Sequence, residues 1–129
     1  MKVLITGASG YIGNRLAHQL AAENTQVVAL IRSDAALPSL QHPNITPIIG
    51  DICKPECLAS AIKGCRQVYH VAGLARLWAP DPSLFYAVNV EGTKNLLLAA
   101  RNEQVEKLVY TSSTAVYGPS LREPITEND

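Results

Sequence analysis

Three glycines follow a short apolar run at the start of the chain, in the stretch MKVLITGASGYIG. The run KVLIT (2–6) is rich in β-branched residues, as in a buried strand, and helical spacing begins at residue 11. Each glycine near a helix start costs about 1 kcal/mol relative to alanine, which a plain turn does not require. A turn without side chains leaves the first N–H groups of the helix open to an anion. The spacing Gly7, Gly10, Gly13 therefore predicts a phosphate-binding turn, with a plain strand–helix turn as the alternative.

Apolar runs and helical patterns alternate along the rest of the chain. The predicted strands are 2–6, 26–31, 45–50, 67–73 and 107–113. The predicted helices are 11–23, with an apolar face of Ile12, Leu16 and Leu20, then 55–63 and 84–103. Strands that are apolar throughout indicate a parallel sheet with helices on both faces. The predicted fold class is α/β, a Rossmann-type doubly wound parallel sheet of order 3-2-1-4-5, incomplete at the C-terminus. Residues 1–129 are expected to form one domain, with the proline-containing strand 45–50 at an edge.

The residues at the end of the second predicted strand help to distinguish NAD from NADP as the dinucleotide that such a sheet would bind. In this fold an acidic residue about 20 positions after the glycines binds the ribose 2′-hydroxyl of NAD. Here the strand ends in ALIRSD, so that Arg32 occupies the tip and Asp34 lies two residues further on. The planar fork of an arginine pairs well with a 2′-phosphate, which favours NADP(H) over NAD(H). The alternative is that Arg32 is an exposed loop charge and Asp34 reaches back to the ribose.

Two further strand ends carry residues suited to a nucleotide. After the third strand, Asp51 is a candidate acceptor for the adenine amino group, and Ile52 for packing against the ring. Asp51 is equally suited by residue type to cap the helix that opens near Pro55. After the fourth strand, Ala72 and Gly73 are small and leave room for the middle of the cofactor.

Composition excludes several classes of function. Eleven basic and eleven acidic residues cancel, so no overall charge attracts nucleic acid or an anionic membrane. No apolar window approaches the length of about 18 residues typical of a membrane helix, and the N-terminus lacks the pattern of a signal peptide, so a cytoplasmic protein is expected. The three cysteines, Cys53, Cys57 and Cys65, are expected to be free thiols rather than metal ligands. His70 is interpreted as a core histidine of its strand.

Five motifs stand in a familiar order and spacing: TGASGYIG, GDI, HVAG, NVEGTKNLL and YTSSTAVYG. Over nearly its whole length the sequence resembles the extended short-chain dehydrogenases/reductases, the NAD-dependent epimerase/dehydratase family. The stretch RLWAPDPSLFYAVNVEGTKNLL and the strand end LIR resemble most closely the dihydroflavonol-reductase-like branch, which includes hopanoid-associated sugar epimerases. The resemblance implies hydride transfer between a nicotinamide cofactor and a hydroxyl or carbonyl substrate that is sugar-nucleotide, flavonol-like or sterol-like.

The resemblance also assigns residues. It implies that the cofactor is bound by Gly7, Ser9, Gly10, Tyr11, Ile12, Gly13, Arg32, Asp51, Ile52, Ala72, Gly73 and Ser112. Ser113 matches the catalytic serine or threonine that holds the substrate oxygen, and Asn89 matches the asparagine that supports the active site. By residue type alone, Ser112 and Ser113 would equally suit capping of the following turn. Relatives form dimers through the helix that corresponds to 84–103, so a homodimer is implied.

The sequence departs from the family at its acid–base pair, Tyr-x-x-x-Lys. None of the five tyrosines is followed by a lysine four residues later. We expect the chain to be the N-terminal portion of a longer enzyme, inactive by itself, with an uncovered sheet edge that promotes self-association. The alternative from another class is a non-catalytic dinucleotide-binding sensor or interaction module.

Overall fold

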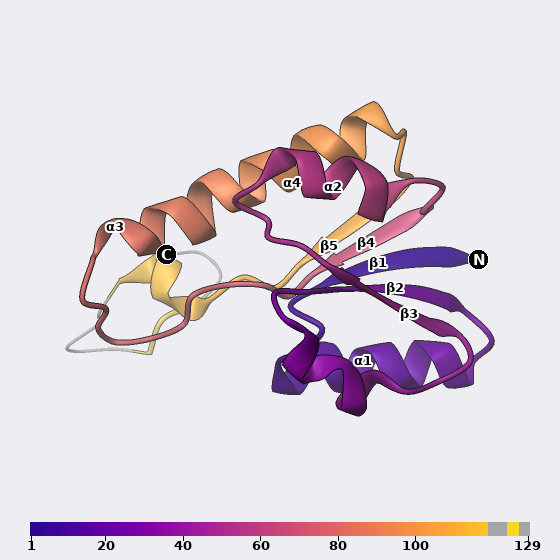
Figure 1. Cartoon of the computed structure of the whole chain (residues 1–129). Coiled ribbons are helices and arrows are strands. Elements are labelled where there is room, and N and C mark those ends of the chain that lie inside the picture. The colour runs from indigo at the N-terminus through magenta and orange to yellow at the C-terminus, as the bar shows by residue number, and fades with distance from the viewer. Residues whose placement is uncertain (119–123, 127–129) are drawn as a thin grey trace.

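A five-stranded parallel sheet forms the centre of the computed structural model, which describes residues 1–118 and 124–126. The strands are β1 (Lys2–Thr6), β2 (Gln26–Ile31), β3 (Ile45–Ile49), β4 (Gln67–His70) and β5 (Lys107–Tyr110). Their order is β3-β2-β1-β4-β5 and every pairing is parallel, which confirms the predicted topology (Figure 1). Pro47 lies in β3, at an edge where a missing backbone N–H costs no ladder bond.

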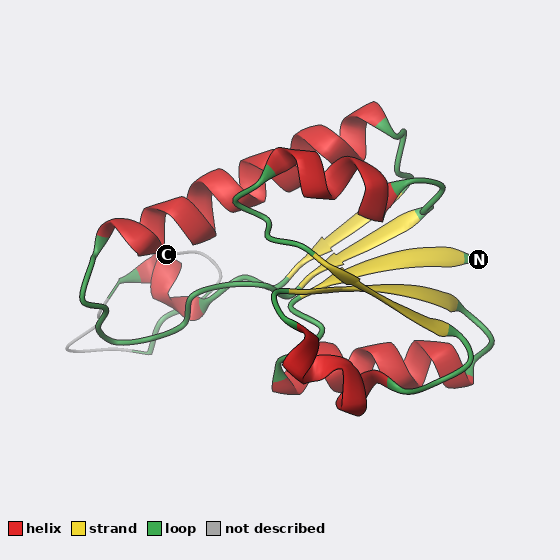
Figure 2. Ribbon diagram, viewed as in Figure 1, coloured by secondary structure: helices red, strands yellow, loops and turns green. Residues whose placement is uncertain are grey.

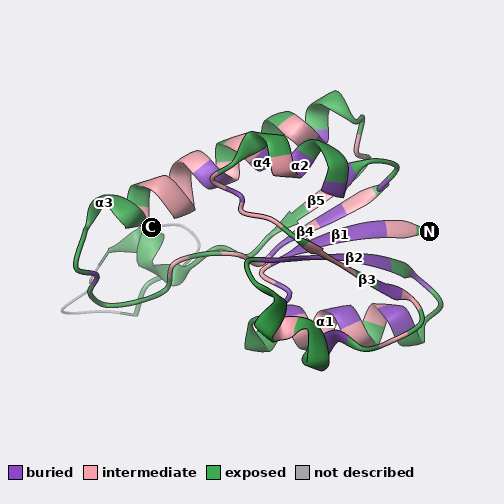
Figure 3. Ribbon diagram, in the orientation of Figure 1, coloured by how far each residue is buried: buried purple, intermediate pink, exposed green. Residues whose placement is uncertain are grey.

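Helices cover both faces of the sheet (Figure 2). The helix α1 (Tyr11–Ala22) and the 3₁₀ helix η1 (Asp34–Leu40) lie on one face, and α2 (Pro55–Ile62) and α4 (Gly92–Asn102) lie on the other. Alternate residues of β1 serve the two layers, because side chains of a strand point to opposite faces. Val3 and Ile5 pack with the α1 layer, whereas Leu4 packs with Leu96 of α4. Burial is concentrated in the central strands and the inner helix faces (Figure 3).

The buried face of α1 differs from the predicted one. Its buried residues are Gly13, Ala17 and Ala21, and the side chain of Ile12 is 58% exposed. Leu16 and Leu20 are only partly buried at the margin of the core. Small residues let α1 lie close to the sheet, so the largest apolar side chains are displaced to its sides.

The predicted helix 84–103 is one helical stretch with an irregular middle. It consists of α3 (Ser83–Tyr86), a π-helical turn η2 (Ala87–Glu91) and α4. A π turn inserts one residue into the helix and often occurs at functional sites. The segment between β2 and β3, for which no helix was predicted, contains η1, and the 3₁₀ helix η3 (Thr114–Tyr117) follows β5.

Two strands are each three residues shorter than predicted. The predicted strand 67–73 ends at His70 and 107–113 ends at Tyr110, because the chain leaves the sheet at its carboxyl edge. The last interstrand bonds there are from Val71 N to Thr6 O (3.2 Å) and from Thr111 N to His70 O (3.0 Å).

Cys53, Cys57 and Cys65 are free thiols. Within the described residues, no helix has both the length and the apolar character needed to cross a membrane.

Candidate functional site

The glycine turn joins β1 to α1 and presses against the end of β4. Gly7 has φ +71°, a conformation that L-residues with a side chain rarely adopt. A β-carbon at Gly7 would lie 2.7 Å from the backbone N of Ala72. A β-carbon at Gly13 would lie 2.3 Å from the carbonyl oxygen of Gly7. Both positions therefore require glycine for the first turn of α1 to sit against the strand ends.

The N-terminus of α1 has no capping side chain. Gly10 is the N-cap, and its N–H donates to Gly7 O at 3.0 Å. The first N–H to find an acceptor within the helix is that of Asn14, bonded to Gly10 O at 2.9 Å. The N–H groups of the first turn thus have no intrahelical acceptor, and the helix dipole adds partial positive charge. Without an acidic residue in this turn, the helix end suits an external anion.

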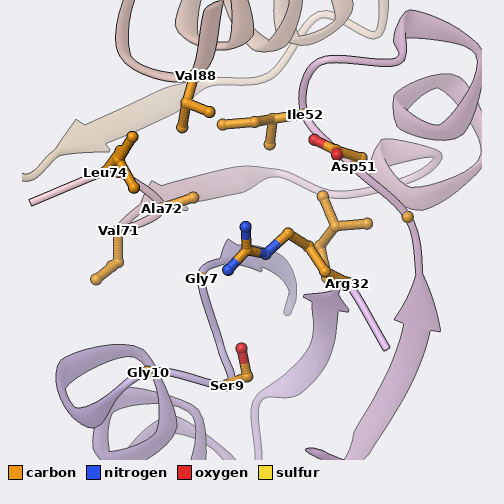
Figure 4. Close-up of a pocket in the computed structure, with 13 residues that line it drawn as sticks. Gly7, Ser9, Gly10, Arg32, Asp51, Ile52, Val71, Ala72, Leu74 and Val88 are labelled. Atoms are coloured by element: carbon orange, nitrogen blue, oxygen red, sulfur yellow. The ribbon is translucent and has the colours of Figure 1, made fainter. Parts of the chain in front are cut away.

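A cavity of about 210 Å³ opens beside this turn, at the carboxyl ends of β1 to β4 (Figure 4). Parallel α/β sheets bind ligands at this edge. The lining residues are Gly7, Ser9, Gly10, Leu30, Arg32, Gly50, Asp51, Ile52, Val71, Ala72, Gly73, Leu74 and Val88. The structure therefore brings eight of the predicted site residues together: Gly7, Ser9, Gly10, Arg32, Asp51, Ile52, Ala72 and Gly73.

One wall of the cavity carries the charged groups. Arg32 extends from the end of β2 with its guanidinium toward the turn at Gly7 (Figure 4). Asp34 is the first residue of η1 and is not among the lining residues. Asp51 lines the cavity, and its Oδ1 accepts a hydrogen bond from the backbone N–H of Cys53 at 2.9 Å. The alternative of Asp51 as a helix cap is wrong, because Lys54 is the N-cap of α2.

Asp51 also affects a neighbouring thiol. Burial and the nearby Asp51 carboxylate raise the pKa of the Cys53 thiol, so it stays protonated at neutral pH. Its Sγ donates to the carbonyl oxygen of Ala87 at 3.5 Å.

Among residues 1–118 and 124–126, no group of three or more His, Cys, Asp or Glu side chains is placed to hold a metal ion.

The opposite wall is the segment 71–74, which Asn89 holds in place. Asn89 Oδ1 accepts the backbone N–H of Leu74 at 2.7 Å, and its Nδ2 donates to Leu74 O at 3.2 Å. The π turn η2 carries both Asn89 and its neighbour Val88, which lines the cavity. Asn89 itself lies behind the wall, outside the lining.

The remaining predicted site residues lie outside the cavity lining. Tyr11 and Ile12 are exposed, and the Tyr11 ring lies 5.6 Å below the Arg15 guanidinium. Ser112 and Ser113 follow β5 and are exposed. Ser113 Oγ accepts the backbone N–H of Ala115 at 3.1 Å, so in this structure it caps η3.

Sequence reasoning missed five lining residues: Leu30, Gly50, Val71, Leu74 and Val88. Leu30, Gly50 and Val71 lie within LIR, GDI and HVAG, and Leu74 directly follows HVAG, so their position at strand ends was a usable signal. Gly50 has a packing role as well, because a β-carbon there would lie 2.9 Å from Leu30 Cδ1. Val88 comes from the helical stretch 84–103, far from the strand ends in sequence, and nothing in its local motif marks it.

Comparison with known proteins decides the family. The model of the NAD-dependent epimerase/dehydratase family matches residues 3–129. The chain belongs to this family. Among curated members, a protein of Synechocystis sp. that bears a dihydroflavonol 4-reductase name is 36% identical over 114 residues, 88% of this chain and 33% of its own length. The 3-beta-hydroxysteroid dehydrogenase of Mycolicibacterium neoaurum is 35% identical over 121 residues, 89% of this chain and 32% of its own.

A solved epimerase structure shares the fold. The UDP-glucose 4-epimerase of Thermus thermophilus, solved in complex with NAD, superposes with a TM-score of 0.87 at 30% identity. The match covers 99% of this chain and 43% of the epimerase. The chain spans about a third of the length of the curated relatives that it matches.

Proposed function

We propose that this chain is the NAD(P)-binding portion of an oxidoreductase or epimerase. The observation that carries the proposal is the uncapped N-terminus of α1, which meets a cavity at the carboxyl ends of the parallel strands. A pyrophosphate at the Gly7–Gly10 turn would accept the unpaired N–H groups there. Family membership and the NAD complex of the structural neighbour support the same ligand.

The two walls of the cavity fit the two halves of a dinucleotide. With the pyrophosphate at the glycine turn, the adenosine half would lie toward Arg32, Asp51 and Ile52. The nicotinamide half would then lie toward the segment 71–74 and Val88. When bound, the nicotinamide donates or accepts the hydride that the family's chemistry requires.

The substrate and the catalytic residues are proposals of the same kind. We assign Ser113 to hold the substrate oxygen, because its Oγ accepts from the Ala115 N–H and its own hydroxyl hydrogen is left for the substrate. We assign Asn89 to support the site through Leu74. The reductase, dehydrogenase and epimerase names of relatives support a hydroxyl or carbonyl substrate of sugar-nucleotide, flavonol-like or sterol-like type. They also favour an enzyme over the second candidate, a non-catalytic sensor. Residues 1–129 alone are expected to bind the cofactor without turnover, since they contain no Tyr-x-x-x-Lys.

Substitution of Gly10 tests the phosphate site. Within 4 Å a β-carbon at Gly10 meets only Gly7 O, at 3.3 Å, so this atom requires a shift of a few tenths of an ångström. Gly10→Val should lower NAD(H) and NADP(H) affinity by about tenfold or more in titration calorimetry, because its methyl groups crowd the turn. Gly64→Ala, in a remote turn with φ +71°, should lower stability but not affinity. Unchanged affinity in folded Gly10→Val would reject the assignment.

We further propose a preference for NADP(H), which Arg32 would provide. Its guanidinium projects into the cavity, whereas Asp34 does not line it. Arg32→Ala should weaken NADP(H) binding by about 1–2 kcal/mol and leave NAD(H) binding nearly unchanged, because only NADP(H) carries the 2′-phosphate. Arg101→Ala, at the exposed end of α4, is the matched control. Equal losses of affinity for both cofactors would show that Arg32 does not pair with the 2′-phosphate.

A further inference from the structure

We infer that His70 is a positioning residue, which links Thr6 to Thr93 and so fixes the cavity wall 71–74. The inference rests on the proposed function, because this wall would face the nicotinamide half of the cofactor. His70 does not line the cavity. It acts through hydrogen bonds that join three elements of the fold, the neighbouring strands β1 and β4 and the helix α4.

A continuous chain of hydrogen bonds runs through the His70 ring. The backbone N–H of Ala72 donates to Thr6 Oγ1 at 3.2 Å, and Thr6 Oγ1 lies 2.7 Å from His70 Nδ1. On the other side of the ring, His70 Nε2 lies 2.9 Å from Thr93 Oγ1. Thr93 Oγ1 donates in turn to the carbonyl oxygen of Asn89 at 2.8 Å.

The partners fix the direction of each bond. A threonine hydroxyl has a single hydrogen, and that of Thr93 goes to the carbonyl of Asn89. Thr93 Oγ1 must then accept from His70, which places the ring proton on Nε2. In a neutral ring Nδ1 is left as an acceptor, and it takes the hydroxyl hydrogen of Thr6. The Thr6 oxygen still has a lone pair for Ala72 N–H, so one neutral tautomer satisfies every atom of the chain.

The surroundings of the ring make this arrangement costly to break. His70 is 1% exposed and Thr6 is 0% exposed. Burial lowers the pKa of His70, so the ring stays neutral at physiological pH. The groups that face it are the two hydroxyls and the Tyr110 ring of β5, whose centroid lies 5.3 Å away. A buried polar group that loses its partner here would keep the full cost of desolvation.

Both ends of the hydrogen-bond chain hold the same segment. At one end is the N–H of Ala72, and at the other is Asn89, whose side chain makes two bonds to Leu74. His70 therefore couples the start and the end of the wall 71–74. Loss of one link should loosen the wall without displacing Arg32 or Asp51 on the opposite side of the cavity.

Thr93 offers the sharpest test, because its variants remove or keep one hydroxyl. Thr93→Val should weaken NAD binding by about threefold to tenfold, the loss typical of one hydrogen bond. Its affinity for ADP-ribose, which lacks the nicotinamide, should not change. Thr93→Ser should bind both ligands as the unmodified chain does, and Thr46→Val on the exposed edge strand β3 is the matched control. Unchanged NAD affinity in Thr93→Val, or equal losses for both ligands, would overturn the inference.

Two measurements without a ligand separate this inference from the proposed function. NMR of the ring nitrogens should show the neutral Nε2–H tautomer in the unmodified chain, and the opposite tautomer would overturn the inference. Amide exchange at Ala72 and Leu74 should accelerate in Thr93→Val and not in Thr93→Ser. If the unmodified chain bound neither NAD nor ADP-ribose, the proposed function would fail, while the exchange data would still decide whether the hydrogen-bond chain positions the wall.

Discussion

At the scale of single residues, glycine at positions 7 and 13 allows two backbone segments to approach more closely than any side chain permits. Gly7 meets the end of β4, and Gly13 meets Gly7 itself. These contacts set the position of the first turn of α1 relative to the strand ends. The proposed anion-binding geometry therefore depends on the lack of a β-carbon at Gly7 and Gly13, and not on side chains that point into the cavity.

Gly13→Ala is expected to destabilise the fold. Its β-carbon would lie 2.3 Å from Gly7 O, within the helix–strand junction, where backbone cannot easily move aside. The expected loss is about 1–3 kcal/mol in the free energy of unfolding, typical of overpacking, although alanine is the better helix former. Urea denaturation measures it, with Gln19→Ala on the exposed face of α1 as the control. A stability equal to or above that of the control would contradict the close contact.

The sequence located the residues of the cavity by their place at strand ends, and this worked where backbone geometry decides. Arg32, Asp51 and Ala72 each follow a strand of the parallel sheet and line the cavity. Side-chain direction is set by packing that a single segment does not reveal. Tyr11 and Ile12 stand beside the glycine turn, yet their side chains lie at the surface.

At the scale of elements, the parallel strands and their order followed from the apolar runs, but the irregular pieces did not. The π turn η2 has the same residue types as the helix around it, and it exists where Asn89 engages Leu74. Likewise β4 ends at His70 because Val71 and Ala72 turn toward the cavity. Such boundaries depend on partners far away in sequence, which periodicity cannot detect.

Burial of His70 between the elements predicts a pH dependence of stability. The buried ring has a lowered pKa, so between that value and about 6.5 the unfolded chain binds more protons than the folded chain. The contribution of His70 is full above about pH 6.5 and is lost as the pH falls through the folded-state pKa, with a slope of at most about 1.4 kcal/mol per pH unit.

Chemical denaturation from about pH 7.5 to about pH 5 checks this dependence. The unmodified chain should lose more stability on acidification than His70→Gln does. Asp81, Glu91 and Glu106 have lowered pKa values and titrate below most of this range. Parallel curves for the two proteins would show that the buried ring does not govern the acid response.

At the scale of the whole molecule, two of the exposed apolar surfaces bear on self-association. Val109 of β5 is 39% exposed, because α1 does not extend over that end of the sheet (Figure 3). On the outer face of α4, Leu97 and Leu98 are 47% and 51% exposed. A homodimer through 84–103, which the family resemblance implies and which we take as a proposal, would cover the second surface and not the first.

Substitutions on the two surfaces distinguish these routes to self-association. Leu98→Lys should lower the dimer fraction in sedimentation velocity, because it adds a charge beside Lys94 and Arg101 on a helix that would pack against its own copy. Val109→Lys should leave the fraction unchanged. If Val109→Lys dissociates the oligomer and Leu98→Lys does not, the sheet is the interface and the proposal for α4 is wrong.

The central place of β1 in the sheet has a consequence for biosynthesis. This strand leaves the ribosome before the other four strands, yet one of its neighbours, β4, ends at residue 70, 39 residues after the other, β2, ends at residue 31. At about 5–20 residues per second, the growing polypeptide presents one side of KVLIT unpaired for roughly two to eight seconds. During that interval the unpaired edge of β1 is exposed to aggregation, the hazard that chaperones counter.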